Sequence, residues 1–185
     1  MNSIINRVDI VDIMENMEII KTPEEVQIRV RELGAEIAKA YGSEPLTMLV
    51  VMNGGLFFAA KLAEAIDLDD FYIDSTAAGS YRGNVRAGDV ELRSRLKLDV
   101  RGRHLLIVDE VLDTGRTLKL IRDNLMELGA LSVKTAVLVE KVLPRPEGIA
   151  HADWAGFFMD DRYLVGCGMD SHEKYRQYPG IAVML

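Results

Sequence analysis

The spacing of apolar residues predicts that helices and strands alternate along the chain. A first helix is expected after Thr22-Pro23-Glu24-Glu25, which joins a hydroxyl cap, a proline in the first turn and acids at the positive end of the helix dipole. Apolar residues at helical spacing follow, and Gly42 closes the segment. The next run, residues 46–52, is apolar almost throughout, which is typical of a strand buried on both faces.

The same alternation continues toward the C-terminus. Strands are expected at residues 71–75, 105–108 and 133–139, helices at 56–66 and 117–128, and two short strands near 154–158 and 163–167. Residues 79–95 mix glycines with charged residues at no clear period, which predicts an exposed, mobile excursion such as a β-hairpin. Strand, glycine turn and helix thus recur in order. This pattern predicts an α/β fold built on an open, mostly parallel twisted sheet flanked by helices.

Composition narrows the classes of function. The 185 residues suffice for one domain, and a net charge of −7 argues against a general nucleic-acid binder, which needs clustered Lys and Arg. The single cysteine, Cys167, excludes an intramolecular disulfide and zinc sites built from cysteine pairs, and three scattered histidines argue against a transition-metal site. Acids interrupt the apolar N-terminal residues 1–20, so these resemble neither a signal peptide nor a membrane span, and a cytoplasmic location is expected.

Two polar loops follow strands that should lie in the same sheet. In open parallel sheets, ligands bind beyond the carboxyl ends of the strands, and both residues 53–55 (Asn-Gly-Gly) and residues 109–117 fall there. Within the second loop, the stretch DTGRT at residues 113–117 places glycine and hydroxyl groups directly before a helix. Such a loop can aim backbone N–H groups and threonine hydroxyls at a phosphate.

A pair of acids, Asp109 and Glu110, comes immediately before that loop. Paired carboxylates at a strand end could hold sugar hydroxyls or a divalent cation, and oxygen ligands of this type suit magnesium. The alternative is a capped helix with solvated acids, and the buried strand that leads into the loop counts against it. The loop is not a Walker motif, and with Gly115 standing alone it is not a dinucleotide-binding fingerprint.

The stretch LLIVDEVLDTGRTL, residues 105–118, resembles the phosphoribosyl-pyrophosphate motif of the type I phosphoribosyltransferases. Three further stretches, VVMNGGLFFAAKL, GSYRGN and DRYLVGCGMDSHEKYR, resemble the first diphosphate loop, the mobile loop and the C-terminal base and metal segment of hypoxanthine-guanine phosphoribosyltransferases. The resemblance covers nearly the whole chain. It implies a single domain with the type I phosphoribosyltransferase fold, whose core spans about 22–142 and whose small hood comes from the N-terminal segment and about 143–185.

The resemblance also assigns roles to single residues. It implies that Asp109 and Glu110 hold the ribose hydroxyls, directly or through Mg²⁺, and that Asp113 is the general base near N7 of the purine. The implied cradle of the 5′-phosphate is Thr114, Gly115, Arg116 and Thr117. The implied diphosphate ligands are Asn53, Gly54 and Arg176, and the family often has a cis peptide that would here join Met52 to Asn53.

The remaining implied roles belong to the mobile loop and the C-terminal segment. Ser80 and Tyr81 match the loop that closes over the reacting centre and excludes water. Tyr163 matches the aromatic residue that stacks on the base, and Asp170 matches a magnesium-linked acid. Without the resemblance, Tyr163 would be read as a core aromatic, Asp170 as a turn residue and Arg176 as a solvated charge.

One residue departs from the family pattern. The family's lysine in a Lys-x-Asp-aromatic-x-Gly context hydrogen-bonds the 6-oxo group of the purine, and the aligned stretch AHADWAGF has His151 there. A neutral imidazole can still donate one hydrogen bond, so we expect His151 to contact the 6-oxo group, with an altered base preference or pH dependence. The alternative is a loop histidine whose function a neighbour has taken over.

The predicted activity is purine salvage: magnesium-dependent transfer of a 5-phosphoribosyl group from phosphoribosyl diphosphate to hypoxanthine or guanine. Two alternatives stay open, a transferase that prefers xanthine and a regulator of the same fold that binds nucleotide and RNA. The acidic balance and the presence of Asp113 count against the regulator. The resemblance also implies association into dimers or tetramers.

Overall fold

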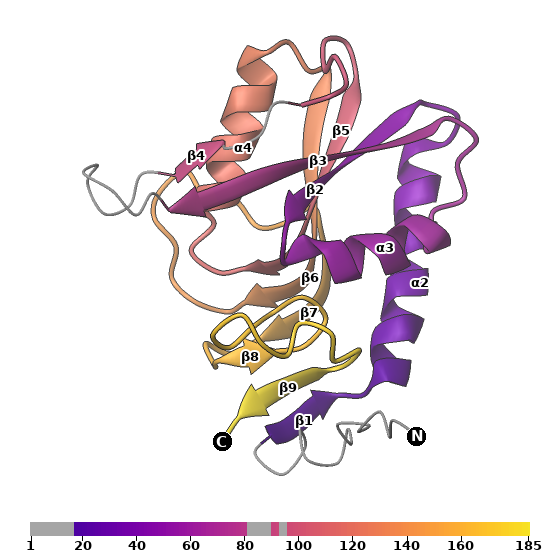
Figure 1. Ribbon diagram of the computed structural model, residues 1–185. Coiled ribbons are helices and arrows are strands. Elements are labelled where there is room, and N and C mark those ends of the chain that lie inside the picture. The colour runs from indigo at the N-terminus through magenta and orange to yellow at the C-terminus, as the bar shows by residue number, and fades with distance from the viewer. Residues whose placement is uncertain (1–16, 81–89, 93–95) are drawn as a thin grey trace, which may run out of the picture.

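A six-stranded sheet forms the centre of the computed structural model, which describes residues 17–80, 90–92 and 96–185 (Figure 1). Its strands are β2 (Leu46–Met52), β3 (Phe71–Ser80), β4 (Val90–Leu92), β5 (His104–Leu112), β6 (Ser132–Lys141) and β7 (Trp154–Met159). The spatial order is β4-β3-β2-β5-β6-β7, and each neighbouring pair is parallel except β3 with β4. The predicted mostly parallel sheet is confirmed.

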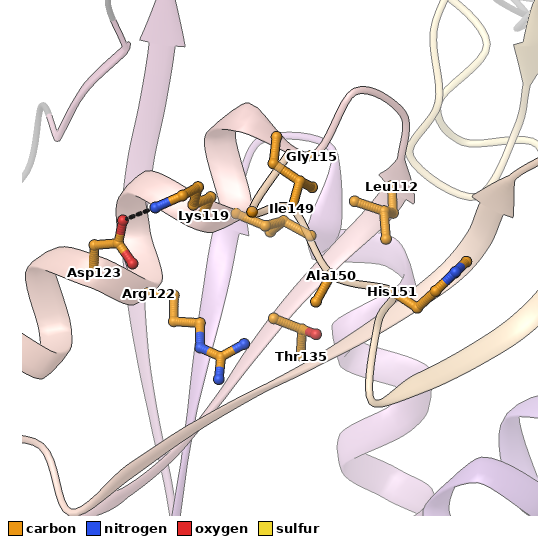
Figure 2. Close-up of a pocket in the computed structure, with 11 residues that line it drawn as sticks. Leu112, Gly115, Lys119, Arg122, Asp123, Thr135, Ile149, Ala150 and His151 are labelled. Carbon is orange, nitrogen blue, oxygen red and sulfur yellow. Dashed lines mark hydrogen bonds and ion pairs between the residues drawn. The ribbon is translucent and has the colours of Figure 1, made fainter. Parts of the chain in front are cut away.

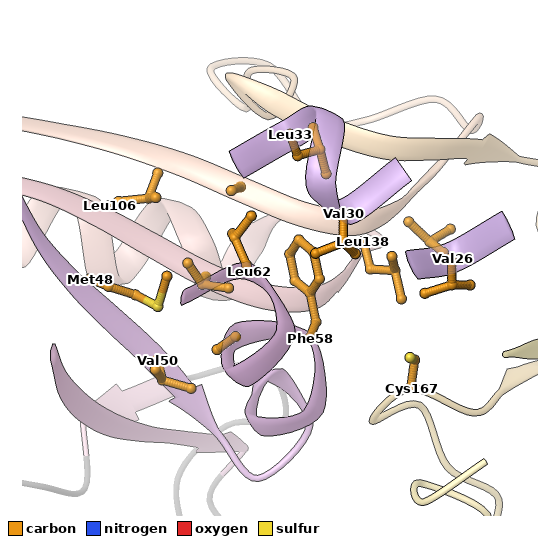
Figure 3. Close-up of a cluster of buried hydrophobic side chains, with 14 of the residues drawn as sticks. Val26, Val30, Leu33, Met48, Val50, Phe58, Leu62, Leu106, Leu138 and Cys167 are labelled. Atoms are coloured by element: carbon orange, nitrogen blue, oxygen red, sulfur yellow. The ribbon is translucent and has the colours of Figure 1, made fainter. Parts of the chain in front are cut away.

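Helices cover both faces of this sheet. α2 (Pro23–Tyr41) and α3 (Gly55–Ala65) pack on one face, where Phe58 and Leu62 meet Met48 and Leu106 in a buried cluster (Figure 3). α4 (Arg116–Glu127) packs on the other face against strand residues of the opposite parity, such as Ile107. Because successive strand side chains point to opposite faces, the continuous apolar runs of β2 and β5 supply both clusters.

The start of α2 has the predicted geometry. The Thr22 hydroxyl accepts a hydrogen bond from the Glu25 backbone N–H at 3.2 Å, and the Glu25 carboxylate accepts one from the Thr22 N–H at 2.8 Å. This reciprocal capping box satisfies two backbone donors that the helix itself leaves unpaired. The sequence signal therefore placed the helix start at the observed residue.

A second, smaller sheet forms the hood from both ends of the described chain. It contains β1 (Met17–Lys21), β8 (Leu164–Val165) and β9 (Ile181–Met184) in the order β1-β9-β8, with antiparallel pairing. The strands β1 and β9 were not individually predicted, because runs of four or five residues show too little periodicity. β7 belongs to the large sheet, although the predicted hood began at about residue 143.

The excursion predicted at residues 79–95 begins as a hairpin. β3 extends to Ser80, five residues beyond the predicted strand, and pairs antiparallel with β4 from Ala78–Leu92 to Ser80–Val90. Tyr81 lies outside the described residues, as does the rest of 81–89 and 93–95. Among the helices that the structure describes, none is long and apolar enough to span a membrane.

Candidate active site

The two polar loops meet where the strand order reverses. The chain runs from β2 outward to β3 on one side and returns through β5 to β6 on the other, so the carboxyl ends of β2 and β5 lie side by side. The Met52–Asn53 peptide is cis. Gly54 follows it and lies so close to Glu110 that a Cβ at position 54 would overlap the Glu110 carboxylate. The loop after β2 and the acid pair are therefore in direct contact.

The acids Asp109 and Glu110 lie side by side near the carboxyl end of β5. Asp109 is buried, and its Oδ1 accepts a hydrogen bond from the Glu110 N–H at 2.9 Å. Burial and the neighbouring Glu110 carboxylate raise the pKa of Asp109 well above its usual range. The Oε2 atom of Glu110 is buried and has no hydrogen-bond partner within the described residues. Two such carboxylates favour a nearby cation.

The loop after β5 surrounds a cavity of about 200 Å³ at the start of α4. Gly115 has a φ of 75°, in the left-handed region, and serves as the N-cap of the helix. The first N–H groups of a helix have no partner inside the helix, so this end of α4 offers donors to an anion. Thr114 and Thr117 line the cavity, whereas Arg116 is exposed on the first turn and is not among its lining residues.

A second cavity, of about 150 Å³, adjoins the acid pair. Its lining residues are Glu110, Val111, Asp113, Lys141, Tyr163, Leu164, Met169 and Asp170. Tyr163 is 57% exposed. Lys141 is largely buried, and its Nζ lies 3.7 Å from Asp113 Oδ2 and 2.7 Å from Asp161 Oδ1. The structure thus brings Asp113, Tyr163 and Asp170 together as predicted, and it adds a lysine that the sequence analysis did not single out.

His151 lines neither of these two cavities. Its side chain is 82% exposed, and its Nδ1 contacts the Glu140 carboxylate. Figure 2 shows His151 at one edge of a different cavity, of about 340 Å³, opposite Lys119 and Arg122 of α4. His151 precedes β7, whereas Lys141 is the last residue of β6, at the carboxyl edge of the sheet where ligands bind.

The C-terminal segment packs directly on the loop after β2. A Cβ at Gly168 would overlap the Gly54 carbonyl oxygen, and Gly168 has a φ of 102°. Arg176 donates to the Gly168 carbonyl at 2.6 Å and pairs with Asp170 at 2.7 Å and Glu173 at 2.9 Å. The predicted diphosphate and metal residues of this segment therefore lie together, with Arg176 engaged by two acids.

Comparison with known proteins identifies the family. Residues 16–168 match the family described as phosphoribosyl transferase domain. The chain belongs to this family. A hypoxanthine-guanine-xanthine phosphoribosyltransferase of Tritrichomonas foetus is 32% identical over 92% of this chain and 93% of its own length. A hypoxanthine-guanine phosphoribosyltransferase of Streptococcus pneumoniae is 32% identical over 90% of this chain and 92% of its own length.

Solved structures agree with these relatives. A hypoxanthine phosphoribosyltransferase of Staphylococcus aureus superposes with a TM-score of 0.88 at 28% identity, covering 96% of both chains. The Trypanosoma cruzi hypoxanthine phosphoribosyltransferase in complex with the product IMP gives a TM-score of 0.83 at 27% identity, covering 92% of this chain and 96% of its own. The predicted family, fold class and enzyme class are confirmed.

Proposed function

We propose that the protein transfers a 5-phosphoribosyl group from phosphoribosyl diphosphate to N9 of hypoxanthine or guanine. In this reaction, the bond from the anomeric carbon to the diphosphate breaks and a bond to the purine nitrogen forms. The observation that carries the proposal is that Asp113 lines both cavities, one at the N-terminus of α4 and one beside Tyr163. A nucleotide could place its phosphate in the first cavity and its base in the second.

The phosphate end relies on backbone geometry. Thr114, Gly115 and Thr117 surround the cavity at the start of α4, where backbone N–H groups and hydroxyls would bind the 5′-phosphate. The exposed Arg116 would add positive charge at the rim. Holding the phosphate here orients the ribose, and such positioning lowers the barrier because the reactants are already aligned.

The base end relies on three side chains. Tyr163 would stack on the purine, and Asp113 would take the proton that the purine loses when its nitrogen bonds to the anomeric carbon. Lys141 supplies an ammonium group in the same cavity and would donate to the 6-oxo group. This assigns to Lys141 the contact that the resemblance gave to His151.

The diphosphate end combines the loop after β2 with the acids. Asn53 and Gly54 would offer backbone groups, Arg176 a guanidinium, and Ser80 and Tyr81 the closing loop. The unpartnered Glu110 oxygen and the buried Asp109 fit a Mg²⁺ ion, with Asp170 in the same region. No group of three or more acids, histidines or cysteines among the described residues could hold a metal alone, which suits an ion shared with substrate phosphates. Bound Mg²⁺ would neutralise the departing diphosphate.

The proposal is tested with a panel of bases. The protein is incubated with phosphoribosyl diphosphate, Mg²⁺ and hypoxanthine, guanine, xanthine or adenine, and diphosphate release is measured. We expect turnover with hypoxanthine or guanine and none with adenine, which lacks a 6-oxo group for Lys141. Fastest turnover with xanthine would favour the xanthine-specific alternative, and no turnover with any base would overturn the enzyme proposal.

Two further expectations accompany this proposal. We expect a cytoplasmic protein, as suits salvage of free bases. We also expect a homo-oligomer, with the N-terminal segment or the face near Met52 as the interface; on that face Leu56 of α3 is 46% exposed. Light scattering on the purified protein would measure the oligomeric state, and a monomeric mass at micromolar concentration would contradict this expectation.

A further inference from the structure

The backbone pairing of β5 and β6 stops just short of the proposed base site. The last registered pair is Leu112 with Glu140. The next two residues are Asp113 and Lys141, the proposed general base and base-binding lysine, and they lie beyond the last β5–β6 pair. Lys141 still pairs with Met159 of β7, whereas Asp113 lies beyond the end of β5, so the strand pairing alone does not fix the position of Asp113 relative to Lys141.

Arg145 connects Asp113 and Lys141 through its single guanidinium group. Its Nε donates to the Asp113 carbonyl oxygen at 3.1 Å, and its Nη2 donates to the Lys141 carbonyl oxygen at 2.7 Å. Its side chain is only 8% exposed, so water competes little for these bonds. Because a guanidinium is planar and rigid, the two bonds fix the two carbonyls relative to one another.

The charge of Arg145 is compensated by the buried acid Glu140. The Glu140 side chain is 2% exposed, and its Oε1 accepts from Arg145 Nη1 at 2.9 Å. His151 Nδ1 contacts the same oxygen and lies 3.3 Å from Arg145 Nη1, while the Ala152 N–H donates to Oε2 at 3.1 Å. Glu140 thus has donors on both oxygens, and the arginine has both a counter-charge and a fixed direction.

We propose that Arg145 is a positioning residue that holds Asp113 and Lys141 at their working separation, with Glu140 and His151 as its support. The inference rests on the proposed function, because it assumes that Asp113 and Lys141 act on the base. It also gives the histidine a role away from the base: His151 stabilises the carboxylate that orients Arg145.

The test compares two arginine-to-lysine variants, R145K and R29K. Arg29 of α2 is a matched control, since its Nε and Nη2 donate to the β7 carbonyls of Gly156 and Ala155 at 3.0 and 3.1 Å and its Nη1 pairs with two acids of α2. A lysine keeps the charge but cannot bind two carbonyls in a fixed plane. Steady-state kinetics are measured for both substrates, and thermal unfolding is measured in parallel.

We expect R145K to lower kcat/KM for hypoxanthine by about 10- to 100-fold, because a misplacement of about 1 Å in the reacting geometry can cost up to about 100-fold. The KM for phosphoribosyl diphosphate should stay within about twofold of the parent value, and R29K should match the parent in both parameters. E140Q, which keeps the shape of the acid and removes its charge, should reproduce the selective loss and serves as the test if R145K does not fold.

The outcomes separate the two proposals. An active parent protein whose R145K and E140Q variants keep parental kinetics would overturn this inference and leave the proposed function intact. Equal losses in R145K and R29K would also overturn it, because they would reduce Arg145 to a general stabilising residue. An inactive parent protein would overturn the proposed function and the inference with it.

Discussion

Replacing Lys141 with methionine should weaken recognition of the purine more than any change at His151. Methionine keeps most of the lysine's length and removes the ammonium group, which lies 3.7 Å from Asp113 and 2.7 Å from Asp161. A hydrogen bond involving a charged group contributes about 1.5–3 kcal/mol, and this corresponds to a loss of about 10- to 150-fold in kcat/KM. Asp161 is well exposed, so water can replace its lost partner and the stability of the fold should change little.

The assay is steady-state kinetics with hypoxanthine and guanine for K141M, beside H151A as the control. We expect the loss in K141M to fall mainly on the KM for the base, since the 6-oxo contact exists before and during the reaction. H151A removes one of the partners of Glu140 but leaves the Arg145 and Ala152 contacts of that carboxylate in place, so its loss in kcat/KM should be smaller than that of K141M and should leave the ranking of bases unchanged. Parental kinetics in K141M together with a large loss in H151A would refute this assignment.

Three further predictions concern stability and the acid pair. G168A should lower stability and raise the KM for phosphoribosyl diphosphate, because its Cβ would overlap the loop after β2. G102A is the control, since Gly102 also has a positive φ but has open space around it, and it should lose only about 1–3 kcal/mol of stability from backbone strain. Thermal unfolding measures both losses of stability. T22A should cost about 1 kcal/mol and lower Tm by roughly 2–4 °C without changing kcat. D109N should raise stability at neutral pH, because burial raises the pKa of the Asp109 carboxyl in the folded protein. The parent protein therefore loses stability as the pH rises from the unfolded-state pKa of Asp109, about 3.9, toward its folded-state pKa, and the asparagine variant does not. Denaturant titrations measure the difference, and a stability gain that persists below about pH 4 would contradict this reasoning.

Much of the fold was predictable because its signals are local and strong. The capping residues at Thr22 and the apolar runs of β2 and β5 each agree with the element that forms. The loop at residues 113–117 was predictable for the same reason, since strand, acids, glycine and helix follow one another directly. The hood strands β1 and β9 were not, because their pairing joins residues more than 160 positions apart, as Met17 with Met184.

The residue proposed to contact the base was harder to predict than the loop before α4. His151 was chosen from a short local pattern, and the segment that carries it folds toward α4, where it contacts Glu140. Lys141 belongs to no comparable local motif, but its position at the end of a buried parallel strand could have pointed to it, because ligands bind at that edge of the sheet. The buried pair of Glu140 and Arg145 left no sequence signal, because charged residues are usually solvated and only the tertiary structure shows them enclosed.

A crystal structure of the protein with bound IMP would be the most direct test of the proposed function. We predict that the 5′-phosphate lies against Thr114 to Thr117, that the purine stacks on Tyr163, and that Lys141 Nζ lies within about 3.2 Å of the 6-oxo oxygen. A nucleotide whose base instead contacts His151, in the cavity lined by Lys119 and Arg122, would contradict it.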